Sequence, residues 1–100
     1  MTDIEIDKAL ALAIGWKRIL PNPEADGLKQ CWVWTGSVWR LFSHSNWNVI
    51  GPIAERYNCF PLRLRDGAWE AISRSKYKLG FVKADTPQKA IALAVIGAKK

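Results

Sequence analysis

Histidine and cysteine are scarce in this 100-residue sequence, which has one histidine and two cysteines. Cys31 and Cys59 are too far apart to form a C-x-x-C pair, and only His44 accompanies them. A structural zinc site takes four closely spaced ligands, so the sequence predicts no metal site. Paired carboxylates, a phosphate-cradling glycine loop and a Cys-His motif are also missing. We therefore expect no cofactor and no enzymatic activity.

Long apolar runs are missing as well, so the sequence predicts no membrane-spanning segment. The first residues, Met1 to Glu5, are acidic where a secretory signal would be basic and then apolar. This pattern favours a reducing cytosol, in which both thiols are free and buried.

Acidic residues are few: nine Asp and Glu stand against fifteen Lys and Arg, which gives a net charge of +6. Many of the basic residues lie in the second half of the chain. Such a charge attracts nucleic acid or an acidic protein, and by itself it does not choose between them.

The pattern near the N-terminus predicts a helix from Asp3 to Ile14, with apolar residues at three- and four-residue spacing. Thr2 and Glu5 have the spacing of a capping box, and Gly15 stands where a helix-ending glycine belongs. The segment from Pro21 to Leu28, rich in turn residues, predicts a loop.

Residues Cys31 to Phe42 predict a β-hairpin with Gly36 and Ser37 as its turn. In that register Trp34 lies opposite Trp39, and Trp32 lies opposite Leu41. Because strand side chains alternate between faces, these four share one face. We expect this tryptophan face to be the platform of the core, and we expect most of the six tryptophans to serve the core.

The second half of the chain predicts a helix, a second hairpin and a final helix. Because proline is harmless at the first helical position, we expect the helix to start at Pro52 and to end near Tyr57-Asn58. A helical turn before Gly51 stays open as an alternative. The hairpin comprises residues 60–65 and 68–73 around the Asp66-Gly67 turn, and residues 79–82 extend or edge the sheet. Thr86 and Pro87 set the start of the last helix. The prediction is one α+β domain over residues 1–100, in the order α-β-β-α-β-β-α, with a mostly antiparallel sheet.

The segment Trp47 to Arg56 reads W-N-V-I-G-P-I-A-E-R. It resembles the NinX-like family of small lambdoid-phage proteins, in which W-x-x-x-G-P-I-x-E-R is followed by a tryptophan-containing strand and a terminal helix opened by T-P. Trp69 and Thr86-Pro87 fit those later features. More loosely, the pattern is similar to the phage ABA sandwich domain. The resemblance implies a phage- or prophage-encoded accessory protein of the bacterial host cytoplasm, and it carries no defined chemistry.

Two interpretations of this motif stay open. In the structural one, Gly51 adopts backbone angles that other residues avoid, Pro52 opens the helix and Ile53 points into the core. In the functional one, Trp47, Glu55 and Arg56 form a surface that binds a partner.

Two further groups carry possible chemistry. His44 lies between two serines, and a histidine beside hydroxyls suggests an activated nucleophile. The sequence specifies no third group to orient His44, so a loop or capping role is favoured.

Separately, a basic strip with two-residue spacing suits phosphate contact, or a solvated sheet edge that discourages aggregation. Its members are Arg63, Arg65, Arg74, Lys76 and Lys78.

The leading hypothesis is therefore a phage accessory protein that binds a host or phage protein without catalysis. Nucleic-acid binding through the basic strip is the alternative, and a small enzyme ranks third.

Overall fold

The computed structural model describes residues 2–22, 30–74 and 79–99, and it is an α+β fold of three helices and two small antiparallel sheets. The elements in chain order are α1 (Asp3–Ala13), β1 (Ile19–Asn22), β2 (Gln30–Trp34), β3 (Trp39–Leu41), α2 (Trp47–Arg56), β4 (Phe60–Arg63), β5 (Trp69–Arg74), β6 (Leu79–Ala84) and α3 (Pro87–Lys99). The predicted fold class is confirmed. The predicted order of elements lacked β1. The prediction also left open how residues 79–82 join the sheet, and in the structure these residues belong to β6.

Helix α1 begins and ends as its caps predict. The Thr2 hydroxyl oxygen accepts a hydrogen bond from the Glu5 backbone N–H at 3.3 Å, and the Glu5 carboxylate accepts one from the Thr2 backbone N–H at 3.4 Å. The Thr2 hydroxyl also donates a hydrogen bond to the Glu5 carboxylate at 2.9 Å. This bond, together with the one from the Thr2 backbone N–H, lowers the pKa of the exposed Glu5 carboxyl. Gly15 follows the helix with a φ of 106°, a left-handed conformation that favours glycine.

The first sheet has the order β1-β2-β3. Trp34 lies opposite Trp39 and Trp32 opposite Leu41, so the predicted hairpin register is confirmed. The loop prediction was wrong at its start, because Ile19–Asn22 forms β1 and pairs with β2. A strand that contains Pro21 is possible here because β1 is at the sheet edge, where a missing N–H costs little.

The second sheet has the order β4-β5-β6, and its first hairpin is the predicted one. Gly67 has a φ of 87° in the turn, and the Asp66 carboxylate accepts a hydrogen bond from the Ala68 backbone N–H at 3.0 Å. The Lys83 ammonium lies 2.7 Å from the same carboxylate. Asp66 therefore fixes the turn and ties it to β6.

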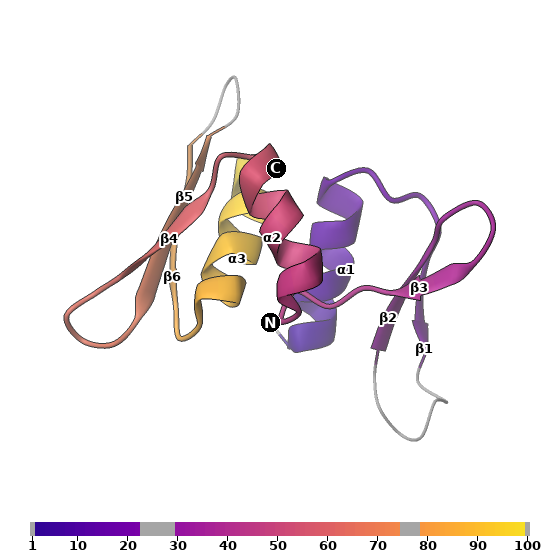
Figure 1. The fold of residues 1–100 in the computed structure, drawn as a ribbon, viewed down its shortest axis with the longest axis horizontal. Coiled ribbons are helices and arrows are strands. Elements are labelled where there is room, and N and C mark those ends of the chain that lie inside the picture. The colour runs from indigo at the N-terminus through magenta and orange to yellow at the C-terminus, as the bar shows by residue number, and fades with distance from the viewer. Residues whose placement is uncertain (1, 23–29, 75–78, 100) are drawn as a thin grey trace.

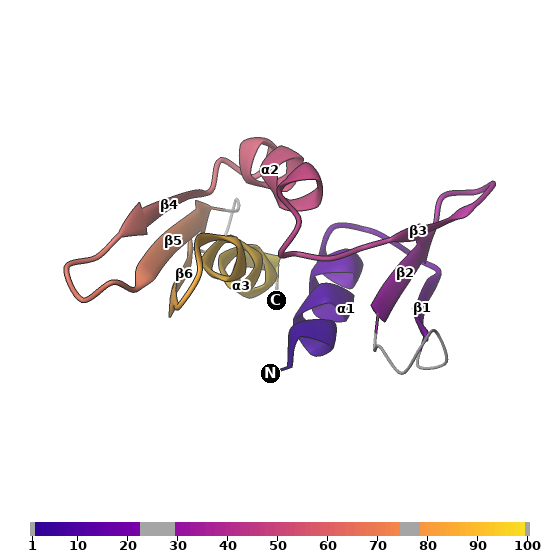
Figure 2. The same cartoon turned by 60° about the horizontal axis from the view of Figure 1, so that its bottom comes forward.

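Helix α3 lies between the two sheets, as Figures 1 and 2 show. Figure 1 places the sheets at opposite ends of the long axis, with α3 against β4–β6, α1 against β1–β3 and the two helices in contact. The buried residues of α3 point in several directions: Ala90, Ile91, Ala92, Ala94, Val95, Ile96 and Ala98. A helix that packs on more than one side needs apolar residues beyond a single stripe, which explains its alanine-rich composition.

The start of α3 is also the predicted one. The Thr86 hydroxyl oxygen accepts a hydrogen bond from the Lys89 backbone N–H at 3.2 Å, and the helix begins at Pro87. Thr86 thus occupies the capping position that the sequence assigned to it.

Helix α2 begins at Trp47 and not at Pro52, so the predicted start was wrong. The Asn46 side chain accepts a hydrogen bond from the Asn48 backbone N–H at 2.9 Å and caps the helix, with Pro52 inside it. Proline disfavours the α-conformation of the preceding residue mainly through a clash with that residue's N–H and Cβ. Gly51 has no Cβ, which lessens this clash, and its φ is not positive. The structural role expected for Gly51 is therefore corrected.

The tryptophan face of the first sheet is its outer face, so its expected role as the platform of the core was wrong. Trp39 and Leu41 are 38% and 44% exposed, whereas Cys31 and Val33 on the opposite face are buried. None of the six tryptophans is buried. The core is built instead from aliphatic residues of the helices and the inner faces of the sheets.

Candidate functional site

The residues of the α2 motif do not form one cluster. Trp47 is half-exposed at the first turn of α2, and Arg56 is the last helical residue. They are nine residue steps apart, which separates them by about 13 Å along the helix axis and by about half a turn around it. Glu55 and Arg56 are exposed and Ile53 is buried, as expected. The three candidate partner-binding residues therefore do not form a single contact surface on this short helix.

Arg56 instead lines a groove of about 670 Å³ between the end of α1, the β2–β3 hairpin and α2. Its other polar lining residues are Arg40, Asn46 and Asn48, and among the described residues no carboxylate lines it. The Arg56 guanidinium also lies 5.5 Å from the centre of the Tyr57 ring. The sequence motif gave no sign of this groove, because its walls come from segments that are distant in the chain.

The outer face of the β4–β5–β6 sheet carries large apolar side chains in solvent. Phe60 and Leu62 are 62% and 64% exposed, and Ile72 is 39% exposed. Phe60 lies opposite Ile72 in the register, and Leu62 lies two residues along the same strand. Leu62 in turn lies opposite Glu70, which lies opposite Lys83. The outer face thus carries three exposed apolar side chains beside the charged residues Glu70 and Lys83. We call Phe60, Leu62 and Ile72 the apolar sheet face.

The outer face of the first sheet carries aromatic and cationic groups together. The ring centres of Trp34 and Trp39 are 5.3 Å apart. The Arg18 guanidinium lies 5.4 Å from the Trp34 ring centre and 5.9 Å from that of Trp39. We call Arg18, Trp34 and Trp39 the indole–arginine row.

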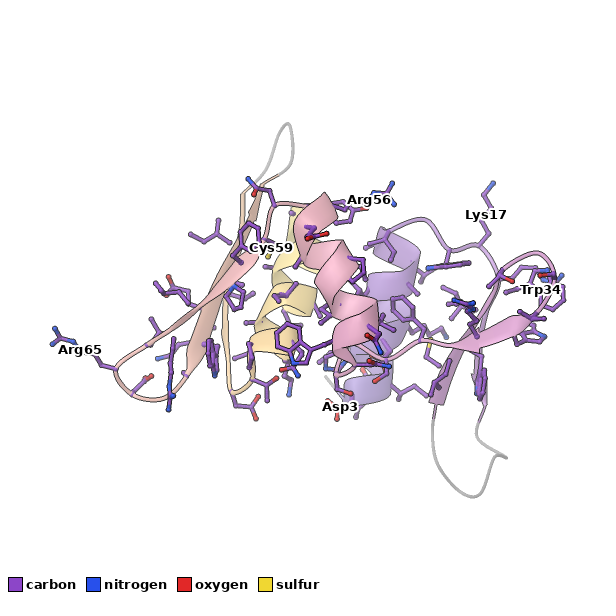
Figure 3. The ribbon with its side chains drawn as sticks, viewed as in Figure 1. Asp3, Lys17, Trp34, Arg56, Cys59 and Arg65 are labelled. Carbon is purple, nitrogen blue, oxygen red and sulfur yellow. The ribbon has the colours of Figure 1, made fainter. Side chains whose placement is uncertain are left out.

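The basic strip is only partly covered by the described residues. Strand β4 ends at Arg63, and Arg65 lies in the turn that follows, so the two do not share a strand face as predicted. The Arg63 guanidinium lies 6.0 Å from the centre of the Trp69 ring. Arg65 is exposed at the end of the hairpin, far from Trp34 at the other end of the molecule (Figure 3). The Arg74 side chain, Lys76 and Lys78 lie outside the described residues.

His44 has a buried carboxylate partner that the sequence did not reveal. One oxygen of Asp7 accepts a hydrogen bond from the His44 backbone N–H at 2.7 Å and lies 2.6 Å from the ring Nδ1. Both residues are buried, with 3% of His44 and 7% of Asp7 exposed. The hydroxyl oxygens of Ser43 and Ser45 lie 2.8 Å from each other and are not bonded to the His44 ring. The geometry is that of a pair that ties α1 to the segment before α2.

The only sequence signal for Asp7 was its place beside Ile6 and Leu10 on the buried side of α1. A cavity of about 180 Å³ adjoins the pair, with Asp3, Cys31 and the two serines in its lining. Within the described part of the chain, no three His, Cys, Asp or Glu side chains are grouped so that they could hold a metal ion.

Both cysteines are free and buried, as predicted. Burial raises the pKa of each thiol to about 11, and for Cys31 the Asp7 carboxylate adds to this effect. Neutral, buried thiols are poor nucleophiles, so neither belongs to a candidate site.

No protein-family model matches the chain, and no curated protein sequence is significantly similar to it. Among the described helices, none has the length and apolar character needed to cross a bilayer.

Proposed function

We propose that the chain is a non-catalytic accessory protein of a bacteriophage or prophage that binds a host or phage protein through the apolar sheet face. The phage assignment rests on the resemblance of residues 47–56 to the NinX-like family. The binding assignment rests on one observation, the exposure of Phe60 and Leu62 by more than 60% each on a single strand.

The energetics favour a protein partner for this face. Exposed apolar patches on a folded domain mark interaction surfaces, and full burial of a Phe or Leu side chain contributes about 1.5–3 kcal/mol. The neighbouring Glu70 and Lys83 supply the polar border that protein interfaces commonly have. The partner that fits is a protein with an apolar patch of its own.

The absence of catalysis in this proposal is supported by the Asp7–His44 pair. A general base must come within hydrogen-bond reach of its substrate, and the His44 ring is almost fully buried. Its Nδ1 is already engaged by Asp7. The pair therefore suits a structural role.

The test is affinity capture from a bacterial lysate with four immobilised proteins: wild type, Phe60→Ser with Leu62→Ser, Leu12→Ser with Val38→Ser, and Trp47→Ala with Arg56→Ala. Leu12 and Val38 are 58% and 53% exposed but lie outside the apolar sheet face, so the third protein is the matched control. We expect the wild type, the control and the α2 variant to retain the same partner and the sheet-face variant to lose it.

Two results would contradict the proposal. One is a sheet-face variant that is folded and still captures the partner. The other is loss of the partner only from the Trp47→Ala, Arg56→Ala protein, which would move the interface to α2 and its groove.

A further inference from the structure

The indole–arginine row forms a continuous line across three neighbouring strand positions. Trp34 is paired with Trp39, and its backbone N–H donates to the Arg18 carbonyl oxygen at 3.0 Å. The three side chains therefore share the outer face of the sheet, with Leu41 exposed in the next position along β3. Trp39 exposes more than a third of its surface, so part of its ring is open to a ligand.

Every charge on the described part of this sheet is positive. Residues 15–22 and 30–42 contain Lys17, Arg18 and Arg40 and no carboxylate. All three cations are exposed, and in the described structure none of them forms an ion pair. Arg18 belongs to the indole–arginine row and Lys17 precedes it in the chain, whereas Arg40 lies opposite Val33 on the other face of the sheet. An Arg over an indole ring still has N–H groups at its edge, and these donate well to phosphate.

We propose that this face binds a single-stranded nucleic acid, with bases stacked on the Trp39 and Trp34 rings and phosphates bound by Lys17 and Arg18. Surfaces that bind single strands without sequence preference combine aromatic stacking with a cationic track, and both features are present here. A duplex keeps its bases stacked on one another, so the exposed indoles gain nothing from it. This site is separate from the apolar sheet face, at the opposite end of the molecule (Figure 3).

The test measures fluorescence anisotropy of a labelled twelve-nucleotide oligo-dT at low ionic strength. Trp39→Ala should weaken binding about tenfold, the effect of losing one stacked base, and Trp39→Leu should weaken it similarly while keeping an apolar side chain in the hairpin. Trp47→Ala removes a half-exposed tryptophan elsewhere and should bind like wild type. Melting of each variant shows that it is folded.

Charge removal identifies the phosphate-binding surface. Lys17→Gln with Arg18→Gln should weaken binding and reduce the slope of log K against log salt by about 1.4, since a single strand contributes about 0.7 per phosphate. Arg63→Gln with Arg65→Gln removes the same two charges from the competing basic strip. Under the proposal this second pair leaves the affinity within about twofold of wild type.

Three results would overturn the proposal: no binding of oligo-dT at low salt, equal binding of a duplex, or loss of binding only in the Arg63, Arg65 variant. The last result would assign nucleic-acid binding to the basic strip. None of these outcomes affects the capture experiment on the apolar sheet face.

Discussion

At the scale of single residues, the Asp7–His44 pair is the main polar feature of the core. A carboxylate oxygen only accepts, so the two short contacts at 2.7 and 2.6 Å make the His44 backbone N–H and Nδ1 its donors. Asp3 lies one helical turn away, with its carboxylate 3.9 Å from His44 Nε2 and its side chain 81% exposed. The sequence could predict that His44 is structural, but not its partner, because 37 residues separate the two.

Replacing Asp7 by alanine should lower the free energy of unfolding by about 2–3 kcal/mol, because two buried donors lose their acceptor. Asp3→Ala is the matched control and should change it by less than about 0.5 kcal/mol, because that side chain is exposed. Urea unfolding of the three proteins measures both values. Equal stabilities of Asp7→Ala and Asp3→Ala would show that the buried pair does not stabilise the fold.

The two thiols predict a loss of stability at alkaline pH. Their pKa is about 11 in the fold against an ordinary value near 9.0, because burial disfavours the thiolate. A raised folded pKa contributes stability that is fully present below pH 9 and is lost as the pH rises from 9 through 11. The loss is on the order of 3 kcal/mol per thiol, since one pKa unit corresponds to about 1.4 kcal/mol.

Cys59→Ala isolates this effect from the other groups that titrate in the same range. Unfolding measured at pH 8 and pH 10.5 should show a smaller loss of stability for the variant than for wild type. Parallel losses in the two proteins would contradict the burial argument for Cys59.

At the scale of elements, local patterns predicted the pairing of strands but not which face is inside. The alternation in β2 puts Trp32 and Trp34 on one face and Cys31 and Val33 on the other, and both sets are apolar. We predicted that the face with the large indole rings would be buried, and this was wrong. Side-chain size does not decide which face is buried when both faces of a strand are apolar. The strand β1 was missed for a related reason: a proline signals a loop locally, and only the position of β1 at the sheet edge makes a strand possible.

A comparison of two substitutions tests the corrected placement. Leu10 is fully buried, so Leu10→Ala should cost about 3–5 kcal/mol, whereas Trp34→Ala on the outer face should cost about 1–2 kcal/mol. Thermal or denaturant unfolding gives the ranking. If the Trp34→Ala protein is destabilised as much as the Leu10→Ala protein, the tryptophan face belongs to the core and the corrected placement is contradicted.

At the scale of the whole molecule, the sequence predicted the class and nearly every element, but it predicted one sheet where there are two. The two hairpins are separated in the chain by α2, and no local signal says whether their strands pair. The arrangement is decided by α3, whose apolar residues on several sides allow β4–β6 to pack on it as well as α1. For the same reason the apolar sheet face and the indole–arginine row were not predicted, since they become surfaces only once α3 separates the sheets.

This separation gives the molecule two chemically different exposed faces toward opposite ends of its longest axis, along which the molecule extends 39 Å. Under the two proposals, one face binds an apolar protein surface and the other binds a phosphate-bearing single strand. Such a chain would bring a protein and a single-stranded nucleic acid together.

The apolar sheet face is the central claim, and site-specific photocrosslinking in bacterial cells tests it most directly. A benzophenone-bearing amino acid at position 62 should give a discrete crosslinked protein, because Leu62 is 64% exposed at the proposed interface. The same group at position 12, where Leu12 is 58% exposed on α1, should give none. Adducts of equal yield at the two positions, or adducts only from a third probe at position 47, would contradict the account.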